Sequence, residues 1–178
     1  MNYKASLMDE AAMLRSLARI THEIIEKNRG CENIMLIGIK RRGITLARIL
    51  ADNIKRFEGV EVPVGYVDIS RFRDDLERAC ASLPQADCHF PESVTKRTVI
   101  IVDDVIYTGR TVRAAIEAVF AQGRPSAIQL AVLIDRGHRE LPIKPDYVGK
   151  NVPTSHDERI SVHVMDIDGD FSVNIEEK

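Results

Sequence analysis

Two adjacent carboxylates, Asp103 and Asp104, are the side chains whose setting most directly indicates chemistry. They follow an apolar, mostly β-branched run at residues 99–102, which is typical of a strand buried on both faces. Ionised carboxylates accept hydrogen bonds from hydroxyl groups and bind hard cations such as Mg²⁺, whereas they repel phosphate. We therefore expect this pair to hold the hydroxyls or the metal ion of a ligand. Solvated acids after a buried strand are the plainer interpretation.

The turn that follows the acidic pair can bind a phosphate. It contains Thr108, Gly109, Arg110 and Thr111 and leads into a predicted helix at 111–120. Backbone N–H groups at a helix N-terminus have no partner within the helix and attract anions. Gly109 places no side chain between the backbone and the ligand. A ribose 5-phosphate, with a phosphate at one end and a diol beside it, fits the turn and the carboxylates together.

A second charged turn consists of Lys40, Arg41, Arg42 and Gly43. Three consecutive cations repel one another unless an anion lies among them, so we expect a further anionic group of the ligand here. Glycines on both sides of the cations would let the backbone approach that anion. A solvated basic turn is the alternative.

Both turns follow strands of a predicted parallel sheet. Strands that alternate with helices form parallel sheets with right-handed crossovers, and their carboxyl ends meet at one edge, where ligands bind. A first helix is predicted at 9–28, with Ser6 and Asp9 in capping-box spacing. The predicted strands occupy residues 33–39, 60–67, 99–102 and 127–134, and a second helix occupies 44–57.

Length and composition set further bounds. The chain has 178 residues, of which 44% are hydrophobic and 29% charged, and we expect a single domain at 1–178. Its net charge of −2 argues against wholesale nucleic-acid binding but leaves room for a local basic face. No apolar run approaches the about 20 residues of a membrane span, and no signal peptide is evident, so we expect a cytoplasmic protein. The cysteines Cys31, Cys80 and Cys88 show no zinc or disulfide pattern.

The run from the buried strand through the acids to the phosphate turn resembles the signature of the type I phosphoribosyltransferases. The resemblance implies a doubly wound, mostly parallel α/β sheet with a flexible lid, here at about 68–96, and a small hood, here mainly 136–178. It implies that the acids hold the ribose hydroxyls of phosphoribosyl pyrophosphate, that Lys40, Arg41, Arg42 and Gly43 hold its pyrophosphate, and that Arg71 and Arg73 act from the lid. Mg²⁺ would arrive with the substrate, with Asp103 and Asp104 as further ligands. A receiver domain also places acids at strand ends, but there the pair follows the first strand.

Longer blocks at 38–43, 72–76, 135–142 and 146–155 resemble the bacterial pyrimidine-operon attenuation regulators, which are also uracil phosphoribosyltransferases. This resemblance implies conversion of uracil and phosphoribosyl pyrophosphate to UMP and pyrophosphate. It also implies UMP-dependent binding of a stem-loop in leader mRNA, which promotes termination of transcription.

The same resemblance assigns further residues. Arg136 and the backbone at Ile160 would form the base pocket. A homodimer or a larger homo-oligomer would join the RNA-binding patches. The residues implied in RNA binding are Arg19, His22, Arg139, Lys144 and Lys150.

Two positions depart from the pattern. Arg41 replaces a threonine in the first loop, and Ala18 replaces a threonine beside Arg19, which removes one hydroxyl from the RNA surface. Two other functions therefore stay open: an RNA-binding UMP sensor with little catalysis, and a plain phosphoribosyltransferase without an RNA role.

Overall fold

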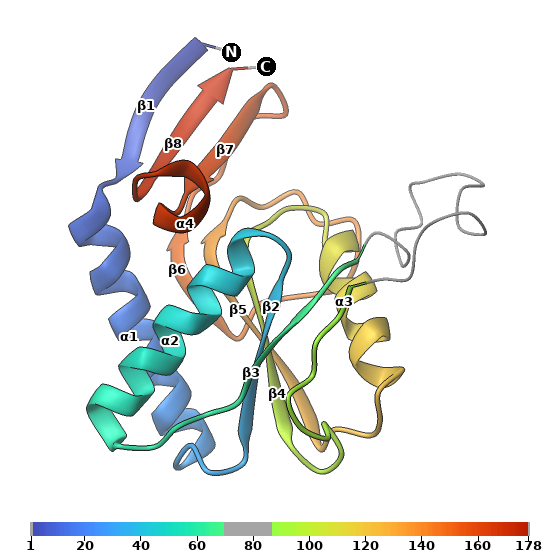
Figure 1. The fold of residues 1–178 in the computed structure, drawn as a ribbon. Coiled ribbons are helices and arrows are strands. Elements are labelled where there is room, and N and C mark those ends of the chain that lie inside the picture. The colour runs from blue at the N-terminus through green and yellow to red at the C-terminus, as the bar shows by residue number, and fades with distance from the viewer. Residues whose placement is uncertain (1, 70–86, 178) are drawn as a thin grey trace.

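A five-stranded parallel sheet forms the centre of the protein (Figure 1). The computed structural model describes residues 2–69 and 87–177 of the chain. The strand order is β3-β2-β4-β5-β6, so the chain winds outward from β2 in one direction and then returns through β4 to the other. The strands are β2 (Ile34–Ile39), β3 (Val64–Val67), β4 (Thr98–Ile106), β5 (Ala127–Asp135) and β6 (Tyr147–Asn151).

Helices cover both faces of this sheet. In Figure 1, α1 (Glu10–Asn28) and α2 (Arg42–Glu58) lie together on one side, and α3 (Arg110–Phe120) lies on the other. Apolar residues therefore fill the space on both faces of the strands, which explains why β2 is buried along its whole length. The predicted α/β fold with a mostly parallel, doubly wound sheet is confirmed.

A second, antiparallel sheet lies beyond the carboxyl ends of the main strands. It has the order β1-β8-β7, with β1 (Asn2–Met8), β7 (Glu158–His163) and β8 (Ser172–Glu177), and the short α4 (Met165–Asp168) connects β7 to β8. Figure 1 shows both chain termini in this sheet. The sheet occupies the place of the expected hood, and it includes an N-terminal strand, β1, that was not among the predicted elements.

Some predicted boundaries were wrong. The capping box is not formed, because Ser6 lies in β1 and Asp9 alone caps α1, accepting a 2.8 Å hydrogen bond from the N–H of Ala12. β3 begins at Val64 and not at residue 60, since Pro63 offers only its carbonyl, which accepts from the N–H of Leu36. β4 does not end at residue 102 but continues through both acids to Ile106.

Phe120 also differs from expectation. It was placed on the buried face of α3, yet 53% of its surface is exposed, while Val112, Ala115 and Val119 are buried as expected. Among the described helices, none combines the length and apolar character that a membrane crossing requires.

Candidate active site

The acidic pair lies inside β4, close to its carboxyl end. Asp103 is 6% exposed, and its Oδ1 accepts a 2.9 Å hydrogen bond from the N–H of Asp104. Burial, together with the neighbouring charge of Asp104, raises the pKa of Asp103 well above its ordinary value. Burial also raises the pKa of Asp104, and the Arg42 cation opposes that rise. Two carboxylates in so little water favour a positively charged neighbour.

The predicted phosphate turn borders a cavity of about 320 Å³, lined by residues 105–112 and Glu140. Gly109 caps α3 with φ +93°, a conformation that other residues rarely adopt, and it has no side chain to cap the helix. The N–H of Arg110 donates a long 3.3 Å hydrogen bond to the Thr108 hydroxyl, and the next N–H groups of the first turn can donate to a ligand. Arg110 stands at the cavity, where its Nε donates a 2.7 Å hydrogen bond to Glu140 Oε2.

The loop after β5 holds the phosphate turn in place. Arg139 donates to the carbonyls of Tyr107 (2.8 Å), Gly137 (3.2 Å) and Ile143 (3.0 Å), and its Nη2 lies 2.5 Å from Asp135 Oδ2. The N–H groups of the next two residues, 140 and 141, both donate to the carbonyl of Thr108. Arg139, which was predicted to bind RNA, thus directs all three of its nitrogens to partners within the chain. RNA contact by this residue stays a prediction.

The second charged turn lies at the carboxyl end of β2, and the peptide bond between Lys40 and Arg41 is cis. Lys40 Nζ lies 2.5 Å from Asp87 Oδ2, and Arg41 is exposed at the N-cap of α2. Arg42 makes a bidentate pair with Asp168 of α4, with N···O distances of 2.8 and 3.0 Å. Two of the three cations are therefore paired with carboxylates of the chain itself.

The glycines of this turn serve the packing of α2. A Cβ on Gly43 would lie 2.4 Å from the carbonyl oxygen of Val102, and a Cβ on Gly38 would lie 2.5 Å from that of Gly43. The glycines let the start of α2 approach β2 and β4 closely, and this suffices to explain them. Their expected role in admitting an anion is not needed to account for the residue type.

The predicted base pocket lies where three segments meet. Arg136 is 6% exposed and donates to the Thr154 hydroxyl (3.0 Å) and to the carbonyl of Glu158 (2.9 Å), at the start of β7. Its guanidinium lies over the ring of Tyr107, 4.0 Å from the centroid. The side chain of Ile160 is buried in the core, which leaves its backbone as the part that could face a base.

Sequence reasoning missed three residues at this place. Tyr107 lies between the acids and the phosphate turn, and the ring of His138 meets it edge-on at a centroid distance of 5.8 Å. His138 Nε2 donates a 2.6 Å hydrogen bond to the carbonyl of Thr154. Glu140 is the third, through its contact with Arg110. Their position directly beside predicted site residues was the available signal.

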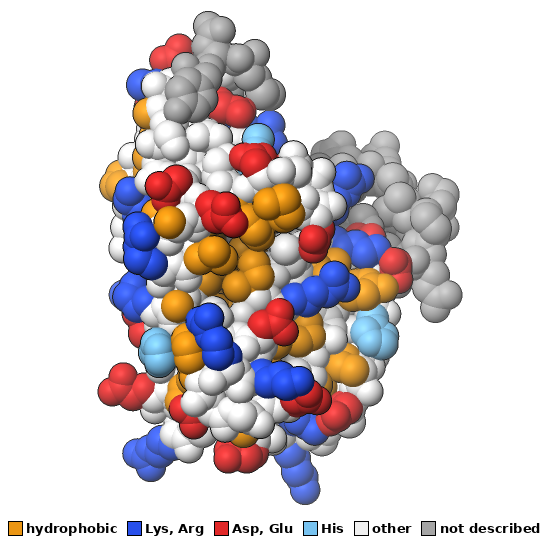
Figure 2. Space-filling model, turned by 60° about the vertical axis from the view of Figure 1, so that its left-hand side comes forward, with side chains coloured by type: hydrophobic (Ala, Val, Ile, Leu, Met, Phe, Trp, Pro, Cys, Tyr) orange, Lys and Arg blue, Asp and Glu red, His pale blue; other side chains and the backbone are white. Residues whose placement is uncertain are grey.

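The residues predicted to bind RNA fall into separate places. Arg19 and Lys150 line a shallow cavity of about 380 Å³ between α1, β1 and β6. Arg19 Nη2 donates to the carbonyls of Val148 (2.9 Å) and Gly149 (2.7 Å), and Lys150 Nζ donates to that of Leu7 (3.2 Å). His22, further along α1, stacks on Phe57 with centroids 4.3 Å apart. On the surface that includes α1 and α2, cationic side chains are interspersed with acidic and apolar ones (Figure 2).

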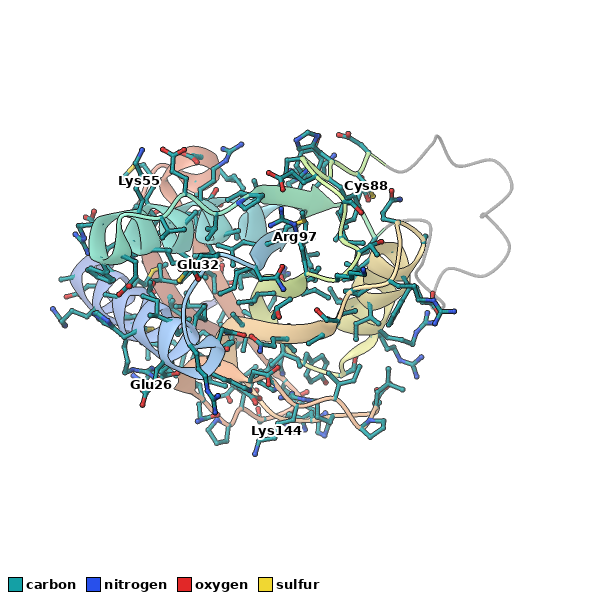
Figure 3. The ribbon with its side chains drawn as sticks, turned by 90° about the horizontal axis from the view of Figure 1, so that it is seen from below. Glu26, Glu32, Lys55, Cys88, Arg97 and Lys144 are labelled. Carbon is teal, nitrogen blue, oxygen red and sulfur yellow. The ribbon has the colours of Figure 1, made fainter. Side chains whose placement is uncertain are left out.

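Lys144 is exposed on the loop between β5 and β6. Figure 3 shows it on the opposite side of the molecule from Lys55, which lies on α2. Arg71 and Arg73, predicted to act from the lid, lie outside the described residues, as does Cys80. The structure leaves their assignments as predictions.

Comparison with known proteins identifies the family. A model described as "Phosphoribosyl transferase domain" matches residues 5–166. Proteins named "Bifunctional protein PyrR" align along nearly the whole chain: that of Clostridium acetobutylicum is 58% identical over 99% of both chains, and that of Clostridioides difficile is 53% identical over 98% of both. The chain belongs to the PyrR proteins of the phosphoribosyltransferase family.

Solved phosphoribosyltransferases share the fold at low sequence identity. The hypoxanthine phosphoribosyltransferase of Trypanosoma cruzi superposes with a TM-score of 0.75 at 18% identity, covering 98% of this chain and 97% of that one. A Staphylococcus aureus enzyme of the same name gives a TM-score of 0.74 at 17% identity, covering 100% and 98%. These structural similarities establish the fold of this phosphoribosyltransferase. They do not identify the base that it accepts.

Proposed function

We propose that this protein transfers the phosphoribosyl group of phosphoribosyl pyrophosphate to uracil, forming UMP and pyrophosphate, and that it also binds the leader RNA of a pyrimidine operon when UMP is bound. The single observation that carries the catalytic part is the union, at one sheet edge, of a buried acidic pair with an uncapped helix N-terminus that opens onto a cavity. Sequence identities of 58% and 53% to proteins named as bifunctional support the second activity, RNA binding.

The residues divide the work of the reaction. The turn at 108–111 binds the 5-phosphate, and Asp103 and Asp104 accept hydrogen bonds from the ribose hydroxyls. The bond from the anomeric carbon to pyrophosphate oxygen breaks, the bond to uracil N1 forms, and the N1 proton passes to water. Positive charge develops on the ribose during this exchange, and the nearby carboxylates stabilise it. Lys40, Arg41 and Arg42 stabilise the departing pyrophosphate, while Arg136 and the backbone at Ile160 orient the base.

Magnesium fits this site as a partner of the substrate. Among the residues that the structure describes, no group of three or more His, Cys, Asp or Glu side chains is arranged to hold a metal ion. Mg²⁺ commonly binds through one or two carboxylates and the phosphates of a substrate, and Asp103 and Asp104 provide such carboxylates. Bound in this way, Mg²⁺ would supply positive charge to the pyrophosphate. We place the protein in the cytoplasm, where its substrates and nascent mRNA occur, as a homodimer or larger homo-oligomer.

An assay of UMP formation from uracil with Mg²⁺ tests the catalytic proposal. Asp104→Asn should lower kcat by about 100-fold, because the carboxylate acts on charge that develops in the transition state. An unchanged rate would show that the acidic pair is not the reacting site. Absence of turnover in the unmodified protein, with UMP still bound, would indicate a sensor. A leader stem-loop bound equally well with and without UMP would contradict the regulatory part.

A further inference from the structure

Lys40, at the start of the proposed pyrophosphate loop, is already held by a carboxylate. Its Nζ lies 2.5 Å from Asp87 Oδ2 and 3.7 Å from Asp68 Oδ2. The other oxygen of Asp87 accepts a 3.1 Å hydrogen bond from the Tyr66 hydroxyl, and the Tyr66 ring lies 5.3 Å from the ammonium group. One ammonium group therefore faces two carboxylates and an aromatic ring.

The backbone around Asp87 is fixed beside β3. The N–H of Tyr66 donates to the carbonyl of His89, and the N–H of His89 donates back, both at 2.9 Å. Gly65 makes this pairing close, since a Cβ there would lie 2.3 Å from the carbonyl oxygen of His89. The thiol of Cys88 adds contacts to the backbone of Asp68. Asp87 thus reaches Lys40 from a defined position.

The contact is an ion pair at neutral pH. The hydrogen bond from Lys40 holds the pKa of Asp87 below its usual value, and the hydrogen bond to Asp87 raises the pKa of Lys40. A pyrophosphate at Lys40 would compete with Asp87 for the same ammonium protons and would be repelled by its charge. The Asp87 side chain is 64% exposed, so it can turn into water when an anion takes its place.

We propose that Asp87 is an internal competitor of the pyrophosphate group and sets the affinity of this site for pyrophosphorylated substrates. The inference rests on the proposed function, which places pyrophosphate at Lys40. It adds an affinity-determining residue that touches neither ribose nor base. Asp87 weakens binding of the substrate and also speeds release of the pyrophosphate product, because both need the same cation.

The test is the variant Asp87→Asn, which keeps the size and polarity of the side chain but removes its charge. Exposed ion pairs contribute little, so we expect the Kd for Mg-pyrophosphate, measured by calorimetry, and the KM for phosphoribosyl pyrophosphate to fall by about fivefold. Loss of folding would weaken binding, so the direction of the change separates competition from damage.

Glu92→Gln is the matched control. It removes one negative charge from the same connecting segment, but Glu92 pairs with Arg97. We expect Glu92→Gln to leave both constants unchanged. In a Lys40→Ala background, Asp87→Asn should have no effect, because the cation for which the two anions compete is gone.

Unchanged or weaker binding of pyrophosphate by Asp87→Asn would overturn the inference, and so would an equal gain in the Lys40→Ala background. Failure of the unmodified protein and of Asp87→Asn alike to bind Mg-pyrophosphate would instead overturn the proposed function, since the anion site itself would be absent.

Discussion

At the scale of single residues, the acidic pair places function in conflict with stability. Asp103 and Asp104 are buried side by side, and burial raises the pKa of both. A folded-state pKa above the unfolded value means that the ionised form is disfavoured in the fold. The resulting loss of stability is absent below the unfolded pKa, grows as pH rises toward the folded pKa, and is complete above it. The proposed reaction accounts for this loss, because the same carboxylates would there meet positive charge.

Asp103→Asn should therefore stabilise the protein while it removes activity. The amide oxygen can still accept the hydrogen bond from the N–H of Asp104, but the buried charge is gone. We expect the melting temperature to rise by about 2–4 °C at pH 7, the gain to vanish near pH 4, and UMP formation to fall sharply. Thermal denaturation between pH 4 and 8 measures the first two effects. A melting temperature lowered at pH 7 would show that the carboxylate stabilises the fold.

Arg42 couples the acidic pair to the charged turn, because its positive charge changes the pKa of Asp104. Its cation lowers the pKa of Asp104, so Arg42→Gln should raise that pKa and move the acid limb of the kcat profile to higher pH. The control is Asp168→Asn, which frees Arg42 from its bidentate pair without removing the cation. That variant should not move the limb upward. Equal shifts in the two variants would mean that the ion pair positions α4 and that the charge of Arg42 does not act on Asp104.

At the scale of elements, the loop after β5 shapes the turn after β4. Arg139 donates to the Tyr107 carbonyl and pairs with Asp135, and Asp135 also accepts a 2.9 Å hydrogen bond from the N–H of Gly137. Contacts of this kind orient a binding turn without touching the ligand. We therefore expect Arg139 to act as a positioning residue for the 5-phosphate, whatever it contributes to RNA binding.

Arg139→Lys separates these roles, because lysine keeps the charge but cannot form the same fork of hydrogen bonds. We expect the KM for phosphoribosyl pyrophosphate to rise by about tenfold with kcat changed much less, since one or two charge-assisted hydrogen bonds are lost. Lys144→Ala, an exposed change in the same loop, should leave KM unaltered. Steady-state kinetics of the two variants decides the matter. An unchanged KM in Arg139→Lys would show that Arg139 does not position the turn.

The helices and strands differ in how well the sequence predicts them. Buried parallel strands and the amphipathic helices were predictable, because their apolar patterns are continuous and their ends carry turn residues. β1 was missed although residues 2–7 alternate polar and apolar side chains, because the segment is short and gains its order by pairing with β8, far away in sequence. β4 was predicted too short, because the extension through the acids depends on pairing with β5 as far as Ile106 and Asp135.

Side-chain partners were the least predictable part of the site. The sequence placed Lys40, Arg42 and Arg139 among residues for external anions, but nothing in local spacing could reveal Asp87, Asp168 or the Tyr107 carbonyl as their internal partners. Each of these contacts joins segments that are brought together only by the fold. A basic turn therefore indicates where anions bind. Its affinity for them depends on carboxylates that lie far away in the sequence and meet the turn only in the folded protein.

At the scale of the whole molecule, α1, β1 and β6 together form the shallow cavity lined by Arg15, Arg19 and Lys150, which we call the basic groove. Arg19 covers edge carbonyls of β6, and Lys150 reaches back to β1, so Arg19 has a structural role beside any role in RNA binding. Lys150 makes one 3.2 Å hydrogen bond from an exposed position, and it is the better probe of the groove.

Lys150→Ala should weaken UMP-dependent binding of a leader stem-loop and reduce the salt dependence of log Kd by about one unit, because one phosphate contact is lost. Lys55→Ala, at another exposed lysine, on α2 and paired with Glu61, is the control and should change neither quantity. Gel-shift titrations across a range of salt concentrations measure both slopes, and UMP formation should stay intact in both variants. An affinity lost without a change of slope would mean that Lys150 supports the hood and does not meet phosphate. The groove between α1, β1 and β6 would then be a structural junction, and the RNA contacts would have to come from the other predicted residues, His22, Arg139 and Lys144.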